Sequence, residues 1–228
     1  MNPLFPRLHL TVMSTRLAIH VWTDLSSPTS FLGLQNLLDG TRGKNVAIEH
    51  HAFFGGEADG AWRDTELQSI GALQEAGLTV TEVEHGDTRA AQELIYAAKE
   101  RGATPEESAA LGVEMAMRIH EAAHLHGRNI ADIDILVELA EESGLDGGAV
   151  RAALSSGQWS ALVDSDVKDA GRLELARAPF LFLSGIYLVE GVQSPEVIAK
   201  LVSSALGEVN EREQAAAGEA RDLFGWQG

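Results

Sequence analysis

The hydrophobic pattern near the N-terminus predicts a strand, a helix and a second strand. Apolar residues run almost without interruption over 17–22 and again over 46–54, and each run is short enough for a buried strand. Between them, 31–38 has the length and composition of a helix, and glycines at 40 and 43 close it. A helix between two apolar strands is typical of a parallel βαβ unit.

The middle of the chain has a different pattern, in which apolar residues recur at helical spacing from 64 to about 159. Polar caps and glycines divide this stretch, and Pro105 followed by two glutamates suits the first turn of one helix. We expect helices at 64–76, 90–101, 105–126, 130–143, 146–155 and 160–175, with a short extended piece at 78–83.

The strand pattern returns near the C-terminus. Residues 179–183 and 186–190 flank a Ser-Gly turn and predict a hairpin, which a helix over 197–206 follows. The acidic residues beyond 207 are expected to continue this helix. The order βαβ, helices, ββα predicts an α/β sheet domain that is split by an all-helical insertion. We assign 1–15 to a flexible tail, 16–60 and 165–207 to the sheet domain, 61–164 to the insertion and 208–228 to an acidic tail.

Composition limits the chemistry of the chain. Its 228 residues contain 17 Lys and Arg against 34 Asp and Glu, a formal charge of −17, which disfavours nucleic acid and anionic membrane surfaces as partners. The chain contains no cysteine, so disulfides, thiolate metal sites and dithiol chemistry of its own are excluded. No apolar run is long enough to span a bilayer.

The N-terminus does not read as a secretory signal. It lacks a continuous apolar core followed by a small-residue cleavage site, and Met13, just before the first strand, is a second candidate start. We therefore expect a cytoplasmic protein.

The turn between the first strand and the first helix is the strongest candidate site. Ser27-Pro28-Thr29-Ser30 lies where the first strand ends and the first helix begins. The free N–H groups and the positive dipole end of a helix N-terminus favour anions, including thiolates. Two hydroxyls stand there three residues apart, the spacing of a redox dithiol.

This turn resembles the active site of the DsbA family of thioredoxin-like oxidoreductases, in particular its FrnE-type branch. The family motif there is Trp-Ser-Asp-x-x-Cys-Pro-Trp-Cys-x-x-Gly, and Ser27 and Ser30 take the two cysteine positions. The residues that match the motif are Trp22, Asp24, Pro28 and Gly33. Three more stretches resemble the family, at 87–94, 127–130 and 178–197.

The resemblance implies a thioredoxin-like fold with a large helical insertion, and an oxidoreductase by descent that lacks its redox pair. It places Ser27 and Ser30 at the catalytic positions and a cis-proline at Pro179. It also implies that Ala178 and Pro179 pair with an extended peptide or a small thiol ligand, beside Trp22, Pro28 and Thr29. No cofactor is implied beyond glutathione as a ligand, and the substrate and oligomeric state are left open.

Three other interpretations compete for the turn. Ser-Pro-x-Ser also resembles kappa-class glutathione transferases and 2-hydroxychromene-2-carboxylate isomerases, which carry Ser-Pro-Tyr-Ser there and whose first serine holds the glutathione thiolate. By position that serine is Ser27, with Thr29 in place of the usual aromatic residue. Alternatively Ser27 is only a helix cap. A third interpretation is a non-catalytic interaction module, with the acidic tail contributing contacts.

The histidines suggest two further sites. His120-Glu121-Ala122-Ala123-His124 is a literal H-E-x-x-H, the zinc-protease pattern, although no third histidine follows at the usual distance. The simpler interpretation is a packed helix with His124 partly buried and His120 solvated. His50 and His51 lie on adjacent strand positions, point to opposite faces and cannot chelate one ion together.

Overall fold

The computed structural model describes residues 16–55, 60–81, 85–185 and 187–223. Its centre is a four-stranded sheet in the order β2-β1-β3-β4. The strands are β1 (Leu17–Thr23), β2 (Val46–Ala52), β3 (Phe180–Leu183) and β4 (Tyr187–Glu190). β2 runs parallel to β1, whereas β3 is antiparallel to both β1 and β4. The predicted βαβ unit and hairpin therefore join in one mixed sheet.

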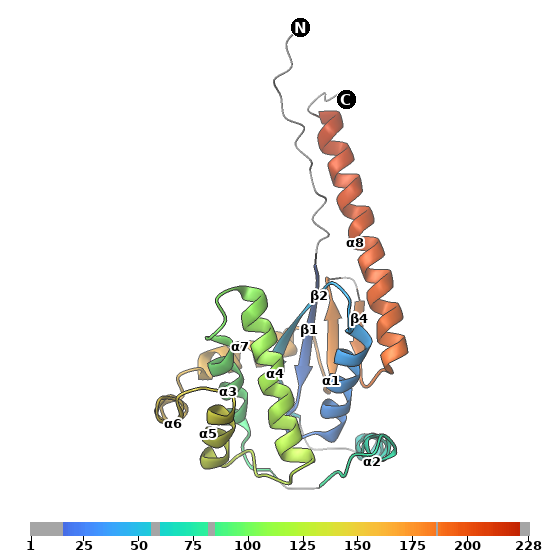
Figure 1. Ribbon diagram of the computed structural model, residues 1–228. Helices are drawn as coiled ribbons and strands as arrows, with labels where there is room; N and C mark the ends of the chain where they lie inside the picture. Colours follow the sequence, from blue (N-terminus) through green and yellow to red (C-terminus); the bar gives the residue numbers. More distant parts are fainter. Residues whose placement is uncertain (1–15, 56–59, 82–84, 186, 224–228) are drawn as a thin grey trace.

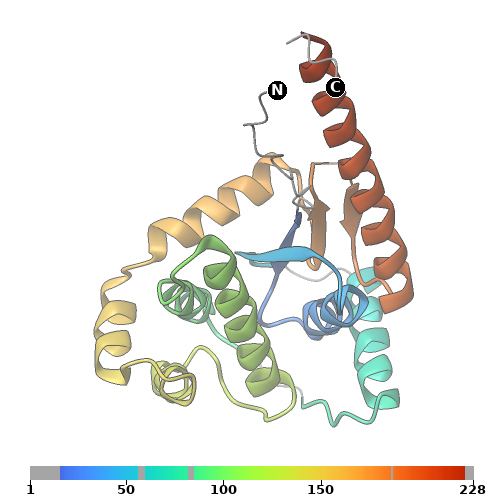
Figure 2. The same cartoon turned by 45° about the horizontal axis from the view of Figure 1, so that its top comes forward.

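Eight helices surround the sheet in the described part of the chain (Figure 1). They are α1 (Pro28–Thr41), α2 (Gly60–Glu75), α3 (Arg89–Lys99), α4 (Pro105–His124), α5 (Ile133–Glu142), α6 (Gly147–Ser156), α7 (Ser160–Arg172) and α8 (Pro195–Leu223). Helices α1 and α8 pack together, α4 packs on α1 and β2, and α3, α5 and α6 lie beyond α4, where α3 contacts α4 (Figure 2). None of the described helices is long and apolar enough to cross a membrane.

Alternation along β1 separates two apolar layers. Leu17, Ile19 and Val21 are fully buried and belong to the main core, which includes residues of α1, α4 and α8. Trp22 points to the opposite face, where it packs with Ala170 of α7 and with the residues around β3. Successive side chains of a strand point to opposite faces, which produces this division. At the C-terminal end of β1, Val21 therefore belongs to one apolar layer and Trp22 to the other.

The structure moves several predicted boundaries. The second strand ends at Ala52 rather than Phe54, because the carbonyl of Phe53 accepts from the Gln92 amide and the chain leaves the ladder. The helix expected over 160–175 ends at Arg172, and Glu174 takes a left-handed φ of 55°. The last helix does continue beyond 207, to Leu223. The assigned boundary at 164/165 falls inside α7, and the domain division stays a prediction.

Candidate functional site

Ser27 caps the N-terminus of α1. Its backbone is extended, with φ −100° and ψ 120°, and its Oγ accepts from the Ser30 N–H at 3.4 Å. Pro28 follows at the first helical position, where its lack of an N–H costs nothing. Only 4 % of Ser27 is exposed. The predicted cap is present, and it places a buried hydroxyl at the positive end of a 14-residue helix.

Asp24 and Ser30 hold the turn in shape. The Asp24 carboxylate accepts from the Ser26 N–H at 2.9 Å and from the Gly55 N–H at 2.7 Å, which joins the turn to the loop after β2. The fully buried Ser30 accepts the Asp24 N–H at 3.1 Å. The Ser30 hydroxyl thus supports the backbone of the turn, and the catalytic role that the resemblance implies for Ser30 stays a prediction.

A carboxylate from another helix contacts Ser27. The Ser27 hydroxyl donates to Glu66 Oε1 of α2 at 3.2 Å. Sequence reasoning missed Glu66, because it lies 39 residues away and no local motif marks it. A carboxylate therefore already occupies the position next to the Ser27 hydroxyl.

The loop before β3 lies against the same helix. The Ala178–Pro179 peptide bond is cis, and both residues are buried. A Cβ placed on Gly33 of α1 would stand 2.3 Å from Pro179 Cγ, so the proline ring packs directly on the glycine backbone. The Pro179 carbonyl accepts from the Gly191 N–H at 2.9 Å. Pro179 thus packs on α1 at Gly33, three residues after the predicted segment 27–30.

Two predicted site residues carry buried polar atoms without a partner among the described residues. They are the Trp22 indole Nε1 and the Thr29 hydroxyl, and Thr29 is fully buried. Buried polar groups are nearly always hydrogen-bonded, so each such atom needs an explanation.

Histidines of α4 lie beneath the turn. His120 and His124 are both buried, and each ring centroid lies 5.8 Å from the Phe31 ring. The His124 Nε2–H donates to the Leu25 carbonyl at 3.2 Å, and His120 Nε2 lies 3.3 Å from Thr23 Oγ1. The expectation that His120 is solvated was wrong, because the face of α4 that carries it packs on the end of β1 and on α1.

Burial controls the charge of these histidines. It lowers the pKa of His124 to about 4 and the pKa of His120 well below its usual range. Both rings are therefore neutral at neutral pH. Glu121, the third member of the H-E-x-x-H pattern, is exposed on another face of α4. Across the described ranges, no set of three or more His, Asp or Glu side chains is placed to hold a metal ion.

The adjacent histidines of β2 have separate partners, as their alternation predicts. His50 Nε2 lies 2.8 Å from Thr23 Oγ1. His51 stacks on Trp22 with 4.5 Å between ring centroids, and its Nδ1 lies 2.7 Å from the Asp166 carboxylate of α7. This contact fixes α7 to the sheet beside the Trp22 ring.

Comparison with known proteins identifies the family of this chain. A family model described as a DSBA-like thioredoxin domain matches residues 18–203. The chain belongs to the DsbA-like thioredoxin family. It is 26% identical over 198 residues to the uncharacterized protein YwbO of Bacillus subtilis, an overlap that covers 81% of this chain and 95% of YwbO. The predicted family and fold are confirmed, and serines stand where the family's cysteines are expected.

Solved structures share the fold at low sequence identity. A probable DsbA oxidoreductase from Streptomyces coelicolor superposes with a TM-score of 0.69 at 22% identity, covering 85% of this chain and 91% of that one. A 2-hydroxychromene-2-carboxylate isomerase gives 0.63 at 15%, covering 87% and 98%. The cytosolic disulfide reductase DsbM from Pseudomonas aeruginosa gives 0.59 at 16%, covering 87% and 99%. A probable DsbA oxidoreductase and a 2-hydroxychromene-2-carboxylate isomerase are thus both among the structures that share this fold.

Proposed function

We propose that this protein is a member of the DsbA-like family without redox activity that binds a glutathione-type thiol at Ser27. Glutathione is a short extended peptide that carries a thiol, so the two predicted ligand classes meet in one molecule. The ligand sulfur would accept a hydrogen bond from the Ser27 hydroxyl, and the peptide backbone would lie along the Ala178–Pro179 loop.

The contact between Ser27 and Glu66 carries this proposal. A buried hydroxyl at a helix N-terminus donates to a carboxylate at 3.2 Å, so the position already accommodates an anion. A ligand thiolate has the same charge and the same need for a donor. Replacement of the Glu66 carboxylate by the sulfur would preserve the hydrogen bond and the interaction with the helix dipole.

The unpartnered atoms beside the turn support a polar ligand. The Trp22 N–H and the Thr29 hydroxyl offer hydrogen bonds that the described protein does not use. The Pro179 carbonyl is already bonded to Gly191, so an incoming strand would pair with the backbone of Ala178 instead.

Structures that share the fold are consistent with this ligand. DsbM from Pseudomonas aeruginosa is known in a structure with GSH, which superposes with a TM-score of 0.56 at 17% identity. The 2-hydroxychromene-2-carboxylate isomerase supports a second candidate, a glutathione-dependent isomerase or transferase in which the Ser27 hydroxyl donates a hydrogen bond to the glutathione thiolate. The Ser27 hydroxyl serves either function.

The absence of cysteine from the chain supports the loss of dithiol exchange, since a serine hydroxyl cannot form a disulfide. We infer a cytoplasmic setting from the acidic charge and from the cytosolic DsbM that shares the fold. We also propose that the partner is a small thiol or extended peptide rather than nucleic acid or membrane.

Calorimetric titration with reduced glutathione tests the proposal. We expect saturable binding to the wild type, and binding about tenfold weaker or more to Ser27→Ala, because a hydrogen bond to a charged group is worth about 1.5–3 kcal/mol. S-methylglutathione is the matched ligand control, because it keeps the peptide but cannot present a thiolate. Insulin reduction should stay at background.

The outcomes separate the alternatives. Absence of glutathione binding to both proteins would leave Ser27 as a helix cap and refute the proposal. Equal affinity for glutathione and its S-methyl derivative would show that the Ala178–Pro179 loop, and not the hydrogen bond from Ser27, provides the binding free energy. Turnover of insulin would contradict the loss of redox activity.

A further inference from the structure

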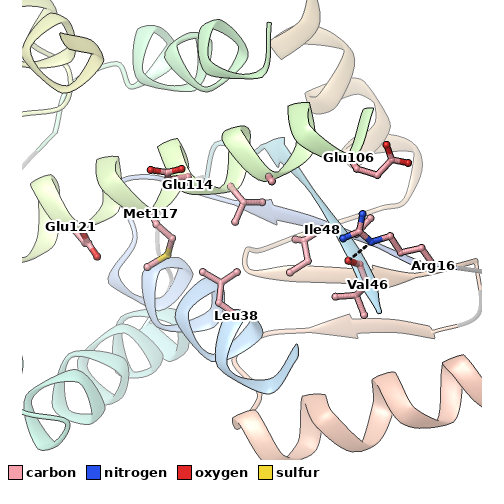
Figure 3. A pocket seen from close by; sticks show the side chains of 11 residues that line it. Arg16, Leu38, Val46, Ile48, Glu106, Glu114, Met117 and Glu121 are labelled. Atoms are coloured by element: carbon pink, nitrogen blue, oxygen red, sulfur yellow. Dashed lines mark hydrogen bonds between the residues drawn. The ribbon is translucent and has the colours of Figure 1, made fainter. Parts of the chain in front are cut away.

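A cavity lies away from the Ser27 turn. It has a volume of about 540 Å³ and is formed by α4, the last turn of α1 and the edge strand β2 (Figure 3). Its volume falls in the range of roughly 300–1,000 Å³ that is usual for small-molecule sites. Leu38 marks its position on α1, in the half of the helix opposite to Ser27.

The floor and walls of the cavity are apolar. Val46 and Ile48 of β2 form the floor, Leu38 of α1 one wall, and Val113 and Met117 of α4 the other. Apart from Val113, these side chains are only partly buried, although they pack against the main core. These side chains are already held in place by the fold, so a ligand that covered them would remove apolar surface from water, which favours binding.

The charged groups around the cavity are mostly negative. Glu106, Glu114 and Glu121 lie along α4 on the face that also carries Met117, and all three are exposed (Figure 3). Arg16 stands near the Glu106 end, where its Nε–H donates to the Val46 carbonyl at 2.9 Å. The Glu121 end has no cation among the residues that line the cavity. Its charge is thus complementary to a cationic group.

Glu114 is partly compensated by a residue outside the cavity, since Arg118 lies 3.0 Å from its carboxylate. Glu121 forms no ion pair within the described part of the chain. Met117 is one helical turn before Glu121, so a ligand whose apolar body contacts Met117 would bring a head group to Glu121.

We propose that this cavity binds an amphipathic amine, with its apolar body over Met117 and Ile48 and its ammonium group at Glu121. The apolar floor selects the body and the carboxylate selects the head group. This site is independent of Ser27 and of the thiol function proposed for the turn.

Methionine methyl NMR gives a direct readout, because the chain contains only four methionines. Met117 lines the cavity, whereas Met115 on the same helix is buried in the core and serves as the internal control. The probes are 4-phenylbutylamine, 4-phenylbutanol and 4-phenylbutanoate, which share one apolar body and differ in the head group. Met117→Leu assigns the resonance.

We expect the amine to shift the Met117 methyl saturably and to bind about fivefold more tightly than the alcohol, the factor that one exposed ion pair supplies. Glu121→Gln should remove this preference while the alcohol still binds. Glu211→Gln, which removes the same charge at an exposed site on α8, should leave the preference intact.

Other results overturn the proposal. Equal binding of amine and alcohol, tighter binding of the carboxylate, or no Met117 shift with any probe would each do so. Loss of preference in Glu211→Gln would show that the amine responds only to the net charge of the protein. A dimer that dissociates on Ile48→Arg would show that a second copy covers the groove instead.

Discussion

Acid should destabilise the protein through the histidines beneath the Ser27 turn. His124 is 3 % exposed and neutral in the folded state, where burial lowers its pKa to about 4. In the unfolded chain its pKa returns to about 6.5, so the unfolded state binds the proton first as the pH falls. The stability that neutral His124 provides is therefore complete above pH 6.5 and declines below it.

The two pKa values determine the size of the effect. Between about pH 8 and pH 5, the linkage relation predicts a loss of about 2 kcal/mol in the free energy of unfolding from His124 alone. The loss stops growing below pH 4, at about 3 kcal/mol. His50 and His120 add to it with the same sign, because burial lowers the pKa of both rings well below the usual value.

Urea unfolding of the wild type and of His124→Gln at both pH values measures the effect. Glutamine does not titrate, and its amide can still donate to the Leu25 carbonyl. We expect the pH-dependent loss to be about 2 kcal/mol smaller in this variant. His126→Gln is the control, because His126 is exposed near the end of the same helix and should leave the loss unchanged. An equal loss in His124→Gln and the wild type would refute the reasoning.

Three further predictions concern the turn and its surroundings. Glu66→Gln removes the anion that competes for Ser27, so glutathione should bind about fivefold more tightly by calorimetry; weaker binding would show that Glu66 assists the ligand. Gly33→Ala puts a methyl group 2.3 Å from Pro179 Cγ and should cost about 1–3 kcal/mol in urea unfolding, whereas Gly71→Ala on α2 meets no atom within 4 Å and should cost nothing. Thr29→Val removes an unpartnered buried hydroxyl and should raise the free energy of unfolding by about 1 kcal/mol while it weakens glutathione binding; a loss of stability would contradict the assignment.

The sequence predicted the parts of the site that are local in the chain. A cap residue followed by proline after a buried strand determines the strand–turn–helix geometry at Ser27, because each of these features acts within a few residues. The βαβ unit and the hairpin could be predicted for the same reason, since their periodicity and turn residues are local signals.

The contacts that complete the site come from distant elements and could not be predicted. Glu66 reaches Ser27 from α2 and Asp166 reaches His51 from α7, and neither residue belongs to a motif. The error at His120 has the same origin. Whether a histidine on an amphipathic helix is buried depends on how that helix packs, and the packing of α4 on α1 and β2 is a property of the tertiary structure.

The polar atoms around the turn fall into two groups, and the difference favours a ligand site over a simple helix cap. Asp24 and Ser30 are satisfied within the protein and hold the backbone. Trp22 Nε1 and the Thr29 hydroxyl are buried without a partner among the described residues, at a cost of about 1–3 kcal/mol each. A helix cap at Ser27 requires neither of these polar atoms. Neither atom is open to solvent, so a ligand pairs with them only when the side chains around the turn move, and the Thr29→Val variant tests whether the ligand does so.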